Sequence, residues 1–177
     1  TDTDTIDPPQ NMAADFTSTF ATDAAPTVTG GAPTNGATGV STATTVTYTF
    51  SENVDAGPGA ALTLECPAGN PIAGTVSGTG TNTLTFTPSA ALPVGTACTA
   101  TTVAANIRDS DSFDPPDLLV ADVARTFTTD APPTVLSTNP ANGASGVPGS
   151  NTITVNFSEP VVFDTAANAG NASFDLE

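Results

Sequence analysis

The chain repeats itself with a period of 107 residues, and this repeat constrains the fold more than any other feature. Residues 26–54 match residues 133–161 at 15 of 29 positions, and residues 2–23 match residues 109–130 at 11 of 22. A period of this length is too long for a solenoid repeat and suits a string of complete domains. We therefore predict a tandem array of similar domains.

The repeat divides the chain into three parts that meet at short linkers containing proline. Pro26 and Pro133 lie at the same phase, and each follows a strand-like segment that contains a phenylalanine. Proline restricts its own backbone and that of the preceding residue, so such linkers join domains semi-rigidly. The predicted parts are the C-terminal end of a preceding repeat (1–23), a complete repeat (24–131) and the N-terminal part of a following repeat (132–177).

Short segments of alternating apolar and polar residues predict an all-β fold. In residues 45–50, Val46, Tyr48 and Phe50 fall on one face and threonines on the other, as in a half-buried antiparallel strand. Because no segment of helical length has an apolar period of 3.6 residues, each unit is expected to be an antiparallel, immunoglobulin-like β-sandwich. Further strands are predicted at 62–64, 72–76, 83–87, 97–103, 123–128 and 152–157.

The charge of the chain excludes several classes of function. It has 18 acidic residues, two basic residues and no histidine or lysine, which gives a net charge of −16. Nucleic acids and anionic membranes require basic patches, so neither is expected to bind. The sequence contains no run of 18 apolar residues, so no membrane insertion is expected. Without histidine or lysine, a serine or cysteine nucleophile has no usual base, so we do not expect an enzyme.

The two cysteines, Cys66 and Cys98, both lie on predicted strands of the complete unit. With Leu62 and Leu64, Cys66 falls on the face expected to point into the core. A disulfide would close a loop of about 32 residues and stabilise the fold by about 3 kcal/mol in the chain-entropy model. The alternative is a pair of buried free thiols. A disulfide would agree with an extracellular location.

An acidic run provides the strongest candidate for a metal site. Residues 109–117 carry carboxylates at alternate positions among hydroxyl groups, and residues 2–9 repeat the pattern. Carboxylate, hydroxyl and carbonyl oxygens are the ligands that Ca²⁺ prefers. The alternative is an acidic surface loop in which Asp and Ser make local turn hydrogen bonds. The candidate ligands are Asp109, Asp111 and Asp114, with Asp2, Asp4 and Asp7 as their equivalents.

Glu52 is a further candidate ligand, because it ends the alternating strand and Glu159 occupies the same phase in the next unit. Such a charge can protect a strand end against aggregation. It can also join Asp109 or Asp111 in a calcium site at the junction between units. Calcium bound there would offset the repulsion between carboxylates and stiffen the chain. Ca²⁺ is the cofactor that the sequence suggests.

Several motifs in this order resemble the bacterial Ig-like domains of S-layer proteins and large surface adhesins, the SbsA-type family. The motifs are Pro33-x-Asn35-Gly36-Ala37-x-Gly39-Val40, Phe50-Ser51-Glu52-x-Val54, Asn82 to Pro88, Pro140-x-Asn142-Gly143-Ala144 and Phe157-Ser158-Glu159-x-Val161. Domains of this kind are mostly spacers, so the resemblance implies a structural role and no particular ligand.

The resemblance and the repeat together predict a tandem Ig-like segment of a large bacterial extracellular or cell-surface protein. Its expected role is structural or adhesive, as a stalk, spacer or fibre component stiffened by calcium. Two alternatives remain: a self-assembling filament or S-layer subunit, and a lectin or protein-binding module. The expected partners are neighbouring repeats of the same chain and, in a fibre or surface layer, other copies of the protein.

Overall fold

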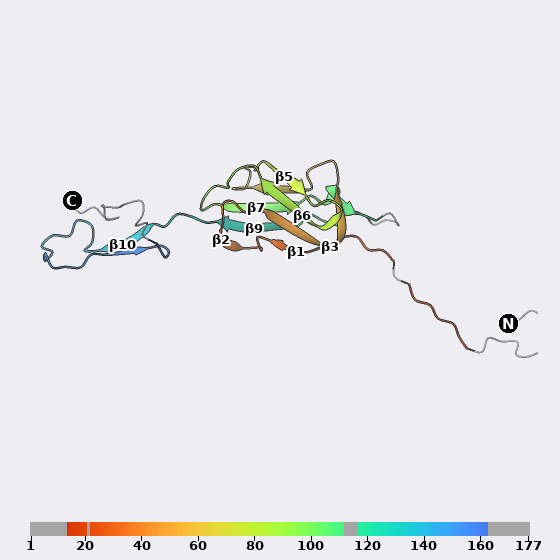
Figure 1. Cartoon of the computed structure of the whole chain (residues 1–177), viewed down its shortest axis with the longest axis horizontal. Helices are drawn as coiled ribbons and strands as arrows, with labels where there is room; N and C mark the ends of the chain where they lie inside the picture. Colours follow the sequence, from red (N-terminus) through yellow and green to blue (C-terminus); the bar gives the residue numbers. More distant parts are fainter. Residues whose placement is uncertain (1–13, 21, 112–116, 163–177) are drawn as a thin grey trace, which may run out of the picture.

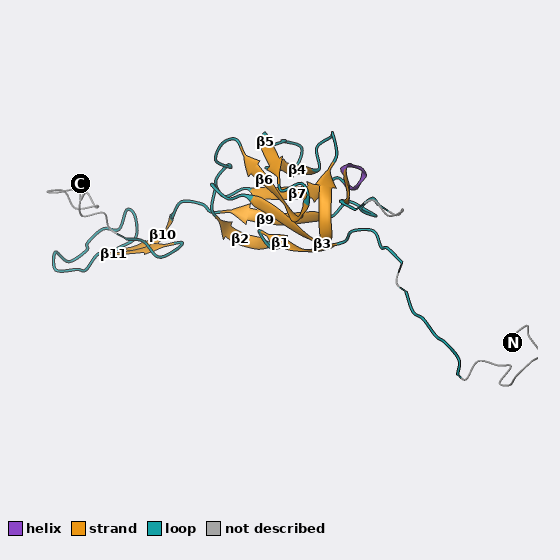
Figure 2. Cartoon of the chain, turned by 45° about the vertical axis from the view of Figure 1, so that its right-hand side comes forward, coloured by secondary structure: helices purple, strands orange, loops and turns teal. Residues whose placement is uncertain are grey.

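The computed structural model describes residues 14–20, 22–111 and 117–162, and these form a nearly all-β molecule (Figures 1 and 2). The complete unit contains nine strands and one short 3₁₀ helix, η1 (Ala104–Asn106). Its strands are β1 (Val28–Ala32), β2 (Ala37–Val40), β3 (Val46–Ala56), β4 (Leu62–Glu65), β5 (Gly74–Ser77), β6 (Thr81–Pro88), β7 (Ala97–Thr102), β8 (Ile107–Asp109) and β9 (Ala124–Thr129).

Two sheets pack face to face in this unit. One has the strand order β1-β3-β6-β5, and β8 pairs with the far half of β3; the other has the order β2-β9-β7-β4. All these strand pairs are antiparallel except β2 with β9, which run parallel. The predicted antiparallel, Ig-like β-sandwich is therefore confirmed.

The core forms where the alternating strands point their apolar side chains at each other. Val46, Tyr48 and Phe50 of β3 are at most 2 % exposed, and Leu62 and Leu64 of β4 are buried from the opposite sheet. The hydroxyl of Tyr48 donates a hydrogen bond to the Ala100 carbonyl at 2.8 Å, which ties the two sheets together. Burial raises the pKa of Tyr48 to about 12, so this hydroxyl remains a donor at neutral pH.

Arg125 of β9 packs on this tyrosine and closes one side of the sandwich. Its guanidinium carbon lies 4.6 Å from the centre of the Tyr48 ring, and Nη2 donates a hydrogen bond to the Gly30 carbonyl. At Gly31, with a φ of +143°, an added Cβ would collide with both Arg125 and the Thr47 carbonyl. Glycine is therefore required where β1 passes the arginine.

Within the complete unit, the sequence located the long strands but missed three short ones. The strands predicted at 45–50, 62–64, 83–87, 97–103 and 123–128 correspond to β3, β4, β6, β7 and β9, and the segment predicted at 72–76 overlaps β5. β1, β2 and β8 were not predicted. β1 and β2 contain glycines that break the alternation, and β8 has only three residues.

Cys66 and Cys98 form a disulfide in the structure. Cys66 directly follows β4, and Cys98 lies on β7, the strand that pairs with β4. Both cysteines are at most 3 % exposed. The bond therefore joins neighbouring strands within one sheet and lies against the core.

The following unit begins with a hairpin that reproduces the first pairing of the complete unit. Its strands are β10 (Val135–Asn139) and β11 (Thr154–Phe157). The four pairs Val135–Phe157, Ser137–Asn156, Thr138–Val155 and Asn139–Thr154 lie 107 residues after the four pairs of β1 with β3, and the irregularity after the first pair recurs. The sequence repeat is thus also a repeat of strand register.

The two linkers lie at opposite ends of the sandwich. The N-terminal segment meets it near β1 and β3, at the right-hand end in Figure 1, and the chain after β9 leaves from the other end toward β10. Entry and exit at opposite ends give the chain an elongated shape.

We expect the double variant Cys66→Ala/Cys98→Ala to lose about 3 kcal/mol of unfolding free energy, because its unfolded chain is no longer cross-linked. Urea unfolding followed by circular dichroism measures the loss. Reducing agent should destabilise the wild type to a similar extent and leave the double variant unchanged. Equal stability of the oxidised wild type and the double variant would contradict the prediction.

We expect Tyr48→Phe to lower the unfolding free energy by about 1–3 kcal/mol, because the Ala100 carbonyl loses a donor from the facing sheet. The aromatic ring and its contact with Arg125 remain in this variant, so the change isolates the hydroxyl. The measurement is again urea unfolding. A loss no larger than that of an exposed control, Thr63→Val, would show that the hydrogen bond contributes little.

Candidate functional site

An acidic cluster lies at the end of the sandwich where the N-terminal linker arrives. It is built on an irregularity of β3. One edge of this strand pairs with β1 up to Phe50 and with β8 from Val54 onward, while the pairing with β6 on the other edge shifts register between Thr49 and Val54. Glu52 lies in the irregular stretch between these two pairings. β8 runs beside the far half of β3 and brings Asp109 opposite Val54. The strand irregularity therefore places carboxylates from two strands at one end.

Asp109 is the buried member of the cluster. It is 4 % exposed, and its main-chain N–H donates to the Asp117 carbonyl at 2.9 Å. The next residue, Ser110, donates its N–H to the Asn53 carbonyl at 3.1 Å. Asp109 therefore ends a strand instead of lying in a surface loop, the alternative that the sequence left open for this run. These two hydrogen bonds hold the main chain at Asp109 and Ser110.

The linker aspartate joins the cluster. Carboxylate oxygens of Asp23, Glu52 and Asp111 all lie within 4.8 Å of one another. The linker is held here by Thr27, whose N–H donates to Ser51 Oγ at 3.0 Å and whose carbonyl accepts a 2.9 Å bond from the Ser51 N–H. The sequence placed Asp23 only at a linker, because no local pattern shows that the linker folds back beside β3.

Two carboxylate oxygens of this cluster lack hydrogen-bond donors. Oδ2 of Asp23 and Oδ2 of Asp109 are shielded from solvent and accept no hydrogen bond from the described residues. A buried carboxylate oxygen without a donor or cation is costly. A ligand that supplies positive charge at this position would remove the cost.

The pKa of Glu52 reflects the same accumulation of negative charge. Burial raises the pKa of its carboxyl above the ordinary value, and the charges of Asp109, Asp23 and Asp111 raise it further. A 3.4 Å hydrogen bond from Ser51 Oγ to Glu52 Oε1 opposes the shift. The net shift is upward, so the repulsion is not balanced by the groups around it.

Asp109 behaves in the same way. Burial raises its pKa, and the carboxylates of Asp111, Asp117 and Asp23 raise it further, while Arg108 lowers it. Arg108 is exposed, and the other arginine, Arg125, is engaged by Tyr48 and Gly30 at a distance from this end. With only two basic residues in the chain, acidic groups outnumber basic ones at this cluster, and a cation from solution would relieve the excess negative charge.

The structure thus brings together two of the predicted ligands, Glu52 and Asp111, with Asp23. The predicted ligand Asp109 lies near enough for its charge to raise the pKa of Glu52. The predicted residues Asp2, Asp4, Asp7 and Asp114 lie outside the described residues. Glu159 lies at the other end of the complete unit, in the following unit. Its equivalent is Glu52, and Asp130 is the equivalent of Asp23.

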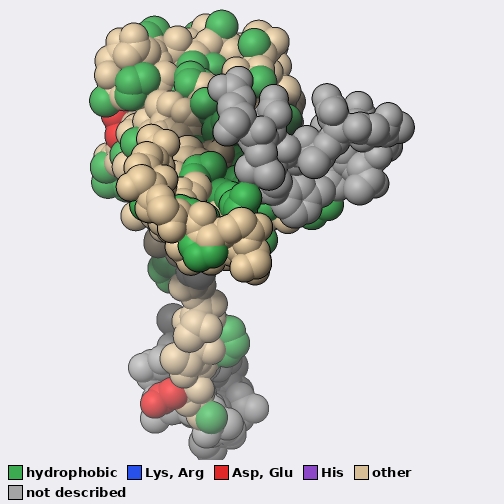
Figure 3. All heavy atoms as spheres, turned by 90° about the vertical axis from the view of Figure 1, so that its left-hand side faces the viewer, with side chains coloured by type: hydrophobic (Ala, Val, Ile, Leu, Met, Phe, Trp, Pro, Cys, Tyr) green, Lys and Arg blue, Asp and Glu red, His purple; other side chains and the backbone are tan. Residues whose placement is uncertain are grey.

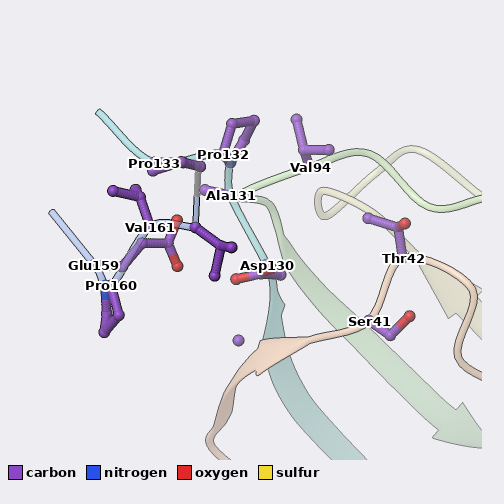
Figure 4. Close-up of a pocket in the computed structure, with 12 residues that line it drawn as sticks. Ser41, Thr42, Val94, Asp130, Ala131, Pro132, Pro133, Glu159, Pro160 and Val161 are labelled. Atoms are coloured by element: carbon purple, nitrogen blue, oxygen red, sulfur yellow. The ribbon is translucent and has the colours of Figure 1, made fainter. Parts of the chain in front are cut away.

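A pocket of about 640 Å³ lies at this second end, between the complete unit and the following one (Figure 4). Glu159 and Val161 lie on one side, Ser41 and Thr42 on the other, and Asp130 between them. Its lining residues are Gly39, Ser41, Thr42, Val94, Asp130, Ala131, Pro132, Pro133, Glu159, Pro160, Val161 and Val162.

The acidic cluster consists of carboxylate oxygens and does not contain a nucleophile paired with a base. Because the sequence lacks histidine and lysine, it lacks the bases that activate most protein nucleophiles. Figure 3 looks onto the opposite end of the sandwich, where uncharged polar and main-chain surface predominates. Grouped carboxylate oxygens of this kind are the ligands that a hard cation such as Ca²⁺ prefers.

Among the described residues, no helix has the length and apolar character needed to cross a membrane. No curated protein matches the chain in sequence. The family model described as "Bacterial Ig-like domain" matches residues 8–129 and 130–176. Domains of this family are common in bacterial surface proteins and are generally not enzymes. With almost its whole length matched and a β-sandwich fold, the chain belongs to the family of bacterial Ig-like domains.

Proposed function

We propose that this chain is a structural segment of a bacterial cell-surface protein, in which tandem Ig-like units act as a stalk or spacer. The observation that carries the proposal is the repeat of strand register at 107 residues, together with linkers at opposite ends of the unit. Units joined end to end in this way extend the chain by the same step each time.

The surface chemistry supports a spacer. A net charge of −16 keeps units of the same kind from associating nonspecifically. The proline-containing linkers restrict bending between units. A disulfide within the sandwich fits an oxidising, extracellular location.

The acidic cluster is the proposed calcium site of this spacer. Glu52 and Asp111 supply carboxylate oxygens within 4.8 Å of each other, the charge of the buried Asp109 acts on Glu52 beside them, and the exposed Asp111 leaves the site accessible from solution. Ca²⁺ accepts six to eight oxygen ligands in irregular geometry, whereas Mg²⁺ demands an octahedron. A cluster assembled from separate segments therefore suits Ca²⁺ better.

The spacer proposal predicts that length grows by a constant step with each added unit. Chains of one, two and three copies of residues 24–131, joined through their own linkers, should show a linear increase of maximum dimension in small-angle X-ray scattering. A dimension that levels off would indicate collapsed units and contradict the proposal. Regular helical assemblies in electron micrographs would instead favour a self-assembling filament.

The calcium proposal predicts opposite pH dependences with and without the ion. Without calcium, the raised pKa values of Glu52 and Asp109 mean that the folded chain binds more protons than the unfolded chain above about pH 4. The contribution of these two groups to stability therefore falls as the pH rises through the raised pKa values. Bound calcium favours the charged carboxylates, so the calcium-dependent stabilisation increases over the same interval.

Urea unfolding between pH 4 and pH 7, in calcium and in EGTA, measures both slopes. Calcium at 100 times its dissociation constant should add about 2.7 kcal/mol to the unfolding free energy. In the variant Glu52→Gln/Asp109→Asn, the calcium effect should disappear. Identical curves for the wild type in calcium and in EGTA would refute the proposed site.

A further inference from the structure

The linker aspartate is attached to two units by different parts of the same residue. At the C-terminal junction, the N–H of Asp130 donates to the Val40 carbonyl at 2.8 Å, and its carbonyl accepts a 2.8 Å bond from the Gly95 N–H. The main chain of Asp130 therefore belongs to the complete unit. Its side chain lines the pocket shared with Glu159 of the following unit (Figure 4).

The N-terminal junction shows which carboxylates lie near the side chain of the equivalent linker aspartate. Asp23 is the equivalent of Asp130 one period earlier, and its carboxylate lies within 4.8 Å of those of Glu52 and Asp111 in the unit that follows it. One oxygen of Asp23 is shielded from solvent and has no hydrogen-bond donor among the described residues, as has one oxygen of the buried Asp109. These oxygens are suited to a cation.

We infer that each linker aspartate joins two units through one calcium ion: its main chain is hydrogen-bonded to the unit before it, and its carboxylate binds the ion held by the unit after it. The ion thereby fixes the angle between successive units. This inference rests on the calcium binding proposed above. It adds Asp23 as a ligand and assigns Asp130 and Glu159 to the equivalent site at the next junction.

The main chain on the far side of each junction is held as well. The N–H of Thr134 donates to Ser158 Oγ at 2.9 Å, as the N–H of Thr27 donates to Ser51 Oγ one period earlier. Ser51 and Ser158 directly precede Glu52 and Glu159. The glutamate that binds the ion and the residue that receives the linker are thus neighbours, so movement of the ion and movement of the linker are coupled.

Removal of calcium should release the linker. Asp23 and Glu52 then carry like charges at short distance, and charge on Asp23 raises the pKa of Glu52. The simplest relief of this repulsion is for the linker to move away, because Asp109 is fixed in β8. The angle between units is therefore expected to depend on the calcium concentration.

Backbone ¹⁵N relaxation of the 177-residue chain tests the inference directly. In saturating Ca²⁺, the order parameters of residues 22–25 should reach the sandwich value of about 0.85, and in EGTA they should fall below about 0.6. In Asp23→Asn, calcium affinity by titration calorimetry should fall about tenfold or more. The linker of this variant should stay mobile even when calcium is saturating.

Asp15→Asn is the matched control, because it makes the same charge change at an exposed position earlier in the same segment. It should keep the wild-type affinity and the ordered linker. Calcium binding without any change in the linker, or wild-type behaviour of Asp23→Asn, would overturn the inference and leave the calcium site itself intact. A wild-type titration without any binding would overturn the calcium proposal and this inference together.

Discussion

Strand β3 is the element on which the rest of the structure depends, because it pairs with β1, β6 and β8 in turn. Its first half supplies the largest buried side chains of the core. Toward its second half, β8 replaces β1 on one edge and the pairing with β6 on the other edge shifts register, and Glu52 lies in this irregular stretch. The core therefore fixes the position of the acidic cluster, because the strand that buries Phe50 also carries the carboxylate of Glu52 two residues later.

The sequence predicted the parts of this structure that follow from local pattern. Alternation with large apolar residues located β3, β4 and β6, and the repeat phase identified Glu52 as a candidate ligand. It could not predict β8, since three residues carry no measurable period, nor the burial of Asp109, since aspartates are rarely buried. Asp23 was missed as a ligand because its position depends on how the linker docks beside Ser51, a contact between segments far apart in sequence.

Comparison of the two hairpins separates residues that the core needs from residues that the junction needs. Tyr48 and Gly31 of the complete unit are replaced by Val155 and Thr138 in the following unit, although the strand register is identical. A core can absorb such changes by adjusting volume elsewhere. Ser51, Glu52 and the linker aspartate recur unchanged. What the repeats share at their junctions is therefore a set of carboxylates and the serine that hydrogen-bonds the linker beside them.

The linker between the complete unit and the following one is short, and its prolines already restrict the freedom that an ion would restrict further. Asp130 is hydrogen-bonded to the complete unit and Thr134 to the following one, so only residues 131–133 lie between the two attachments. Two of these three are prolines, whose φ is already fixed. Ordering a free residue costs about 1–2 kcal/mol, so clamping this linker costs far less than clamping a flexible one of the same length. An ion bound at the proposed site would therefore select one angle from a narrow range, which would favour a stiff junction even when each ion binds weakly.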